Sequence, residues 1–303
     1  MFLLIRDRPD TVLAYTVKPV IYSGLAIRLY RIFCFKHSIF YLPLITGLGY
    51  AFTDQSGGLL RSFLRYFLSF LYKLGLSSSD AICFQNPDDL SLFKRKQLFA
   101  SNCPSYRVWG SGVDLNYFQP KPLPSDHVFL LISRLLVDKG VHDYVNAARL
   151  VKKIHPHVVF RLVGTFDTNP SAISRDELDK WIEEGVIEYL GEQDSVYNCL
   201  ADCRYYVLPS YREGTPRTVL EAMATGRPII TTDVPGCRET VVHGDNGFLV
   251  PARSPEKLAS AMISMIEQPE ASSQKMAQSS LERAKKYFDV CKVNRDLIEI
   301  MSA

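Results

Sequence analysis

The chain has 303 residues, of which 47% are hydrophobic and 22% charged, and its formal net charge is +3. A chain of this length and composition can bury enough apolar surface for two domains, which excludes a disordered protein. Its 7 cysteines are odd in number and contain no Cys-x-x-Cys pair. This pattern argues against a disulfide framework or a zinc site and fits a reducing cytoplasm.

The charge is distributed unevenly along the chain. Residues 1–117 contain 13 Lys and Arg against 7 Asp and Glu, which gives +6, whereas residues 118–303 contain 22 against 25, which gives −3. The basic, aromatic-rich first part suits an anionic membrane surface or lipid, or is an ordinary solvated surface. No nucleic-acid-binding motif accompanies it, so we expect no nucleic-acid partner. Neither a signal peptide nor a spanning helix is predicted, since the longest uncharged run, residues 38–53, contains a proline and two glycines.

The first part of the chain predicts an α/β domain that starts in the middle of its fold. Residues 2–5 are typical of the end of a helix, and residues 11–15 form the first clear strand. We therefore expect earlier elements of this domain to be missing. A helix is predicted over residues 25–33, and an apolar strand over residues 39–45. That strand ends in a loop with Thr46, Gly47 and Gly49, which lacks the third glycine of a dinucleotide fingerprint.

Residues 59–73 predict an amphipathic helix. Basic and polar side chains recur on one face at Arg61, Arg65, Ser69 and Lys73, and leucine and phenylalanine occupy the other. The apolar face either packs against the sheet or contacts lipid head groups. A strand is predicted over residues 81–85, followed by a capped helix. The Gly- and Pro-rich residues 108–126 then predict the linker between two domains.

A second α/β domain begins with residues 128–133, a run suited to a buried parallel strand. Arg134 and Lys139 lie in the loop that follows, before a helix over residues 141–154. Two cations at the carboxyl end of a strand can bind a diphosphate, although either could be an ordinary surface charge. The next predicted elements are a strand over residues 158–163, a helix with a capping box at residues 174–177, and a strand over residues 187–190. The loop after this last strand is suited to contact a nucleotide base.

The stretch from residue 204 to residue 251 predicts strand, loop, helix and strand. Glu213 lies in the loop and Glu221 on the helix, eight residues later, so both can face one cleft. One carboxylate can hold the hydroxyls of a sugar, and the other can accept both hydroxyls of a ribose. The alternative is a loop acid plus an acid on the helix surface. No Asp-x-Asp occurs in the chain, which argues against a metal-bridged donor site and leaves cations and backbone dipoles to neutralise a leaving diphosphate.

This stretch resembles the donor-site signature of the retaining glycosyltransferases of family 4. The signature comprises Glu213-x7-Glu221, the continuation Glu221-Ala-Met-Ala-Thr-Gly-Arg-Pro, and the later Gly236, Glu239, Gly244 and Gly247-Phe-Leu-Val. Further segments resemble a bacterial branch that acts in polysaccharide, capsule, lipopolysaccharide or protein-glycan assembly: Tyr15-Thr-Val-Lys-Pro, Ile45-Thr-Gly-Leu-Gly, Phe84-Gln-Asn-Pro-Asp-Asp, Gly110-Ser-Gly-Val-Asp, Asn169-Pro-Ser-Ala-Ile-Ser and Pro209-Ser-Tyr-Arg-Glu-Gly-Thr-Pro-Arg.

The resemblance implies an α/β protein of the GT-B class, with two facing Rossmann-like domains. Residues 1–117 would form an incomplete acceptor-binding domain, residues 118–290 the nucleotide-sugar-binding domain, and residues 291–303 a closing helix. The implied reaction moves galactose or an N-acetylhexosamine, with retention, from a UDP-sugar to an undecaprenyl-diphosphate-linked saccharide. It implies no metal and no cofactor beyond the nucleotide-sugar co-substrate. A lipid-linked acceptor implies a cytoplasmic protein, peripheral at the inner face of the plasma membrane.

The resemblance also implies roles for individual residues. Glu213, Arg134 and Lys139 would be catalytic, and the donor would be bound by Gly214, Thr215, Pro216, Arg217, Glu221 and Leu190. The acceptor side would include Lys18, Thr46, Gly47 and Gly49. The histidine found in many family 4 acceptor domains has no counterpart near Tyr15 or Thr46.

Two other functions are compatible with parts of the sequence. The short first domain favours a truncated, inactive module that binds a nucleotide sugar, whereas the donor-site residues favour the enzyme. A nicotinamide oxidoreductase would use the same kind of sheet, but the Gly-x-Gly-x-x-Gly fingerprint and its downstream acid are missing.

Overall fold

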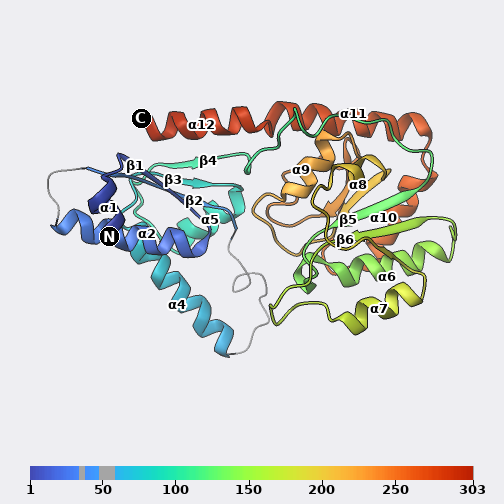
Figure 1. The fold of residues 1–303 in the computed structure, drawn as a ribbon, viewed down its shortest axis with the longest axis horizontal. Helices are drawn as coiled ribbons and strands as arrows, with labels where there is room; N and C mark the ends of the chain where they lie inside the picture. The colour runs from blue at the N-terminus through green and yellow to red at the C-terminus, as the bar shows by residue number, and fades with distance from the viewer. Residues whose placement is uncertain (34–37, 48–58, 303) are drawn as a thin grey trace. The chain divides into compact units, whose positions relative to one another are not determined.

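The computed structural model describes residues 1–33, 38–47 and 59–302. The chain divides into two compact units, the first comprising Met1–Gly110 with Val293–Ala303 and the second Ser111–Lys292 (Figure 1). The sequence placed the boundary after residue 117 and treated residues 291–303 as a separate closing segment. Backbone contacts give the reason for the difference: Val113 N–H donates to Phe288 O at 2.7 Å, and Val290 N–H donates to Val113 O at 3.1 Å. These bonds fix the residues around Val113 to the second unit.

In the first unit, the described residues form a parallel sheet of four strands in the order β1-β2-β3-β4. The strands are β1 (Thr11–Tyr15), β2 (Phe40–Ile45), β3 (Ile82–Phe84) and β4 (Ser105–Arg107). Parallel neighbours need crossover connections, which helices supply. The helices among the described residues of this part of the chain are α1 (Phe2–Asp7), α2 (Val17–Phe33), α4 (Leu59–Leu76) and α5 (Pro87–Arg95), and α12 (Val290–Ser302) ends the described chain.

Helix α2 begins at Val17, eight residues before the helix start predicted from the sequence. Pro19 lies in its first turn, where the backbone N–H groups have no partner within the helix, so a proline is tolerated there. Helices α2 and α4 pack closely because glycines face each other: a Cβ atom added to Gly24 would lie 1.9 Å from Gly75 O. The Tyr41 hydroxyl on β2 donates to Val20 O at 2.5 Å, which ties α2 to the sheet.

The second unit contains a parallel sheet of six strands in the order β10-β9-β8-β5-β6-β7. The strands are β5 (Val128–Ile132), β6 (Val159–Val163), β7 (Glu188–Tyr189), β8 (Tyr205–Leu208), β9 (Ile229–Thr232) and β10 (Gly247–Val250). The chain runs from β5 outward to β7 and then returns to β8 on the other side of β5. The strand order therefore reverses between β5 and β8, and ligands of open α/β sheets bind beyond the carboxyl ends of such a strand pair.

Helices on the second unit follow the predicted βα alternation. They are η1 (Val137–Lys139), α6 (Val141–Lys152), α7 (Arg175–Glu183), α8 (Tyr197–Ala201), α9 (Arg217–Ala224), α10 (Pro255–Glu267) and α11 (Glu270–Tyr287). The predicted capping box is present, because the Ser174 hydroxyl accepts from Glu177 N–H and the Glu177 carboxylate accepts from Ser174 N–H. None of the helices in the described part of the chain combines the length and hydropathy needed to cross a bilayer.

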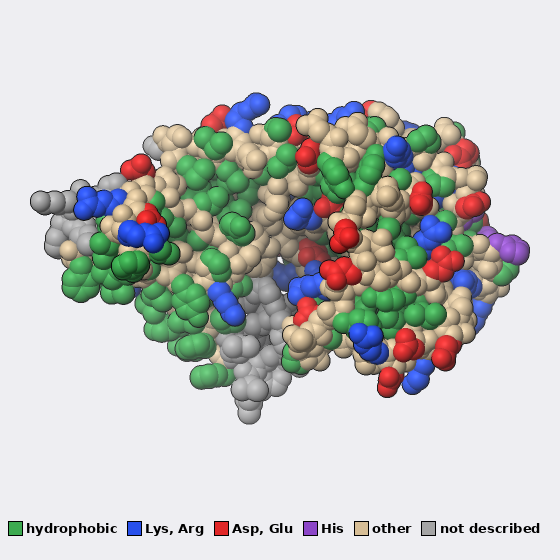
Figure 2. Space-filling view, viewed as in Figure 1, with side chains coloured by type: hydrophobic (Ala, Val, Ile, Leu, Met, Phe, Trp, Pro, Cys, Tyr) green, Lys and Arg blue, Asp and Glu red, His purple; other side chains and the backbone are tan. Residues whose placement is uncertain are grey.

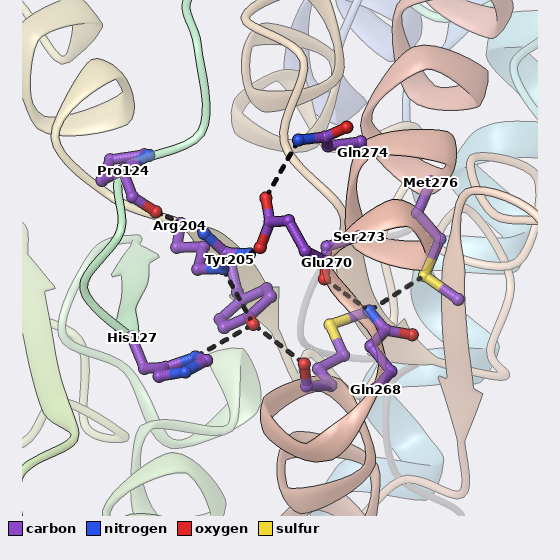
Figure 3. Close-up of polar contacts among 10 residues, drawn as sticks. Pro124, His127, Arg204, Tyr205, Gln268, Glu270, Ser273, Gln274 and Met276 are labelled. Carbon is purple, nitrogen blue, oxygen red and sulfur yellow. Dashed lines mark hydrogen bonds and ion pairs between the residues drawn. The ribbon is translucent and has the colours of Figure 1, made fainter.

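Buried polar side chains attach the linker to the second unit (Figure 3). Arg204 donates to Pro124 O at 2.5 Å and forms an ion pair with Glu270 at the start of α11. The neighbouring Tyr205 hydroxyl donates to Met265 O at 2.8 Å and lies 3.1 Å from His127 Nδ1. Arg227 is completely buried and donates to the carbonyls of Lys121, Pro122 and Cys203. These buried cations satisfy carbonyls that would otherwise be stranded in the interior.

Candidate active site

The candidate site lies where the strand order of the second sheet reverses. Strands β5 and β8 are neighbours, and their carboxyl-terminal loops carry Arg134 and Lys139 on one side and Glu213 on the other. A cavity of about 200 Å³ opens between these loops, and it is lined by Ile132, Ser133, Arg134, Lys139, Leu208, Glu213, Pro216, Arg217 and Thr218. The structure therefore brings together the cations and the loop carboxylate that the sequence singled out.

Lys139 and Glu213 form the central ion pair of the cavity. Lys139 Nζ lies 2.5 Å from Glu213 Oε1, and the two side chains are 18% and 14% exposed. The Ser210 hydroxyl donates to the same oxygen at 2.7 Å. Burial alone would lower the pKa of Lys139, but the charge of Glu213 and the hydrogen bond to it outweigh burial, so the pKa is raised. The ion pair with Glu213 therefore favours the charged form of Lys139, which lines the cavity.

Glycines allow the loops to approach closely enough for this pair to form. Gly140 has φ +74°, and a Cβ atom there would lie 2.1 Å from Pro209 O. Gly236 has φ +86°, and its Cβ atom would lie 2.3 Å from Glu213 O. The Glu213 backbone is held from the same side, because its N–H donates to Pro235 O at 3.0 Å. The position of Glu213 is therefore set by backbone contacts from a third loop.

Helix α9 directs its amino-terminal end into the cavity. Its first residues, Arg217 and Thr218, and the preceding Pro216 line the cavity, and Pro216 provides no side-chain cap. Unpaired N–H groups and the helix dipole make such an end a binding site for phosphate groups. Arg217 is mostly exposed, with its side chain 72% accessible, so it can move toward a bound anion.

Glu221 lies one turn further along α9 than Arg217 and is buried to 8% exposure. Burial raises the pKa of its carboxyl, and the charge of Arg217 partly opposes that rise. Arg217 Nη2 lies 3.7 Å from Glu221 Oε1. Among the described residues, the cation beside this carboxylate is Arg217, and carboxylate oxygens can accept hydrogen bonds from paired hydroxyls.

The sequence predicted that Arg134 binds a diphosphate, whereas in the structure its side chain contacts a carboxylate on another loop. Its guanidinium is 60% exposed and forms an ion pair with Asp167, on the loop after β6, at 2.7 Å. Sequence reasoning did not single out Asp167, because the pair joins residues 33 positions apart on separate loops. Ser133 and Thr218 were also missed, although both line the cavity. The signal for Ser133 was available: it is a small polar residue at the end of an apolar strand.

Four of the predicted donor-side residues are not among those that line this cavity: Gly214, Thr215, Glu221 and Leu190. Gly214 is buried and Thr215 half-buried in the loop before α9. Leu190 follows β7, donates its N–H to Leu162 O at 2.9 Å, and is half-buried. It does not line the 200 Å³ cavity. Its expected contact with a nucleotide stays a prediction.

The predicted acceptor residues belong to the first unit. Lys18 is exposed in the first turn of α2, just after the carboxyl end of β1. Thr46 and Gly47 follow β2, which pairs with β1, so these residues share one edge of the sheet. Gly49 lies outside the described residues. The role of this edge in acceptor binding stays a prediction.

Residues 126–268 match the family model described as glycosyl transferases group 1. They form a glycosyltransferase group 1 domain. This glycosyltransferase domain contains every residue that lines the cavity between β5 and β8.

Curated relatives of the chain are glycosyltransferases. The chain is 29% identical, over 80% of its length, to the N,N'-diacetylbacillosaminyl-diphospho-undecaprenol alpha-1,3-N-acetylgalactosaminyltransferase of Campylobacter jejuni, and the match covers 65% of that protein. It is 24% identical, over 86% of its length, to the UDP-Gal:alpha-D-GlcNAc-diphosphoundecaprenol alpha-1,3-galactosyltransferase of Escherichia coli, and covers 67% of it. The chain therefore spans about two thirds of the length of these relatives.

Solved structures establish the fold. Anabaena Alr3699/HepE, determined in complex with UDP, superposes with a TM-score of 0.80 at 19% identity, covering 99% of this chain and 80% of that one. The α/β GT-B fold expected from the sequence is confirmed.

Proposed function

We propose that the protein is a retaining hexosyltransferase. It moves galactose or an N-acetylhexosamine from a UDP-sugar to an undecaprenyl-diphosphate-linked saccharide during the assembly of a bacterial polysaccharide or glycan. The two curated relatives are named for N-acetylgalactosamine and galactose transfer to such lipid-linked acceptors, which supports both the sugar class and the acceptor class.

The observation that carries the proposal is the Lys139–Glu213 pair at the reversal point of the sheet, beside the open end of α9. In the proposed complex, Lys139 and the α9 N–H groups neutralise the diphosphate of the donor. Arg134 exchanges Asp167 for a phosphate oxygen. Glu221 accepts from the ribose hydroxyls, and Glu213 holds hydroxyls of the transferred sugar.

Transfer breaks the bond between the anomeric carbon and the diphosphate and forms one to an acceptor oxygen. UDP leaves with the electron pair of the broken bond, and the acceptor hydroxyl gives its proton to an oxygen of the leaving diphosphate. Lys139 is placed to stabilise the charge that develops on the leaving diphosphate, and preorganised groups of this kind are worth about 3 kcal/mol each in other enzymes. We propose that neither a metal ion nor a further cofactor takes part.

The acceptor lipid sets the place of action. An undecaprenyl-linked saccharide is anchored in a membrane, so the enzyme would work in the cytoplasm as a peripheral protein at the inner face of the plasma membrane. The basic first unit, with +6 over residues 1–117, suits an anionic surface of this kind.

A transfer assay tests the proposal. The full chain is incubated with radiolabelled UDP-N-acetylgalactosamine or UDP-galactose and an undecaprenyl-diphosphate-linked N-acetylhexosamine, in the presence of chelator. We expect label in the lipid fraction, with the anomeric configuration of the donor retained in the product by NMR. Lys139→Ala should abolish most transfer, whereas Lys153→Ala, an exposed lysine at the end of α6, should not. UDP binding without transfer to any such acceptor would support the inactive binding module instead.

A further inference from the structure

One backbone hydrogen bond joins the two loops that carry the Lys139–Glu213 pair. Tyr211 N–H donates to Asp138 O at 2.9 Å. Asp138 directly precedes Lys139, and Tyr211 lies two residues before Glu213. Because each member of the pair is one or two peptide units from this bond, a displacement of Tyr211 would move both. The contacts that fix the Tyr211 side chain therefore also fix the pair.

A buried carboxylate on α6 holds the Tyr211 side chain. The Tyr211 hydroxyl donates to Asp143, which lies in the first turn of α6 and is 8% exposed. Burial and the charge of Asp143 raise the pKa of Tyr211 to about 12, so the hydroxyl keeps its proton and remains the donor. A buried carboxylate is destabilised when it loses a donor, which makes this bond costly to break.

The loop after β10 contacts both partners of this bond. Arg253 N–H donates to the Asp143 carboxylate, and Arg253 Cζ lies 4.6 Å from the centroid of the Tyr211 ring. Arg253 has φ +58°, in the left-handed region that residues other than glycine seldom adopt. Such backbone conformations persist where surrounding contacts hold them, and they are concentrated at functional sites. Three loops at the carboxyl edge of the sheet therefore meet at Tyr211.

Tyr211, Asp143 and Arg253 together form what we call the Tyr211 cluster. Among the described residues, the lining of the cavity between β5 and β8 does not include any of the three. Tyr211 is half-buried and Asp143 is buried, so neither presents an open surface to a ligand. An effect of the cluster on the reaction must therefore pass through Lys139 and Glu213.

A second buried tyrosine allows this role to be separated from general stability. Tyr144 follows Asp143 on α6 and is completely buried. Its hydroxyl donates to Phe129 O at 2.9 Å and to Arg161 O at 3.0 Å, on β5 and β6. Removing either hydroxyl, from Tyr144 or from Tyr211, deletes buried hydrogen bonds made at the same helix. The Tyr211 bond alone links that helix to the loop of Glu213.

We propose that the Tyr211 cluster positions the Lys139–Glu213 pair for catalysis. The catalytic consequence rests on the proposed function, because a displacement of about 1 Å in an active site can cost about a hundredfold in rate. Tyr211→Phe keeps the ring beside Arg253 and the N–H bond to Asp138 but loses the hydroxyl. It should lower kcat for sugar transfer about tenfold and change the KM for the UDP-sugar by less than about twofold.

Competitive acetylation of lysines tests the positioning in the full chain, without nucleotide or acceptor. Burial alone would lower the pKa of Lys139, but pairing with Glu213 raises it, so less of the reactive unprotonated amine is present. Lysine and arginine side chains are spread over the visible face of the second unit (Figure 2), and the exposed Lys275 on α11 serves as the internal reference. Mass spectrometry of chymotryptic peptides gives both rates. We expect wild-type Lys139 to react about tenfold more slowly than Lys275.

Substitutions within the cluster should release Lys139. Tyr211→Phe should raise its acetylation rate, relative to Lys275, about threefold or more, because the loop loses its bond to Asp143. Asp143→Ala should have a similar effect, and the double variant should exceed neither single variant, since all three break the same bond. Asp143→Asn keeps an oxygen that can accept from both donors, so it should retain most of the protection. Tyr144→Phe is the matched control: it should lower the midpoint of urea unfolding and leave Lys139 protected.

Near-UV circular dichroism verifies that each variant is folded, and Tyr211→Phe with Asp143→Asn carries the test if Asp143→Ala does not fold. The proposal is overturned if Tyr211→Phe leaves Lys139 as slow as in the wild type, or if Tyr144→Phe releases Lys139 equally. It is also overturned if wild-type Lys139 reacts as fast as Lys275, because no fixed pair would then exist. Labelling that responds as expected in a chain that transfers no sugar would refute the proposed function and leave the positioning of Lys139 established.

Discussion

The Lys139–Glu213 pair allows a prediction with a defined magnitude. Replacing Lys139 by Met leaves the Glu213 carboxylate, only 14% exposed, with the Ser210 hydroxyl as its remaining partner at that oxygen. Removing one member of a buried ion pair costs about 3–5 kcal/mol, and because this pair borders a cavity we expect roughly 2–3 kcal/mol. Glu213→Gln should cost a similar amount for the same reason.

The double variant Lys139→Met, Glu213→Gln should lose less than the sum of the two single losses. The difference is the coupling energy, which we expect to be about 1–3 kcal/mol for residues in direct contact. The matched control is the pair Arg134–Asp167, whose arginine is 60% exposed. Its coupling should be below about 1 kcal/mol.

Urea unfolding followed by tryptophan fluorescence measures these energies. The chain contains 2 tryptophans, Trp109 and Trp181. Trp181 lies on α7 in the second unit and is 7% exposed, so a Trp109→Phe background makes the signal report on that unit alone. Single variants that unfold at the wild-type midpoint, or energies that simply add, would refute the description of this contact as a buried, coupled pair.

Three further predictions concern the same unit. Gly244 has φ +81°, and a Cβ atom added there would meet open space, so Gly244→Ala should lower the free energy of unfolding by about 1–2 kcal/mol. In Gly236→Ala the added Cβ atom clashes with Glu213 O, so this variant should lose more stability in urea unfolding and should bind UDP more weakly. Because burial raises the pKa of Glu221 above 4.5, UDP affinity measured by calorimetry should fall on acidification, and Glu221→Gln should lose that component. Burial and the charge of Arg204 lower the pKa of His127 below 6.5, so unfolding free energy should decrease as pH falls below 6.5, and less so in His127→Gln.

The second unit shows which features of the fold can be predicted from the sequence. The sequence predicted a buried parallel strand over residues 128–133 and a strand at the start of the stretch 204–251, and both form, as β5 and β8. Parallel strands end at the same sheet edge, so the loops carrying Lys139 and Glu213 could be expected to lie near each other. The two loops are adjacent because β5 and β8 are neighbours in the sheet. The hydrophobic periodicity of a single sequence does not predict this strand order.

Other features could be recognised only in the three-dimensional structure, because they depend on contacts between segments or on the position of a residue within an element. The sequence predicted a helix from residue 25, whereas α2 begins at Val17, because a proline such as Pro19 is tolerated in the first turn of a helix. The Asp167 partner of Arg134 depends on two loops that meet only in the folded sheet. For α4, the sequence predicted an amphipathic helix but not its orientation, because the glycine contact between Gly24 and Gly75 decides which side packs inward.

Calorimetric titration of the full chain with UDP, in the presence of chelator, tests the central claim most directly. The claim is that Lys139, Glu221 and the end of α9 form a metal-independent site for a uridine diphosphate. We expect saturable binding by the wild type, at least tenfold weaker binding by Lys139→Ala and Glu221→Gln, and unchanged binding by Lys153→Ala. No measurable binding, or binding that appears only after a divalent cation is added, would contradict the account.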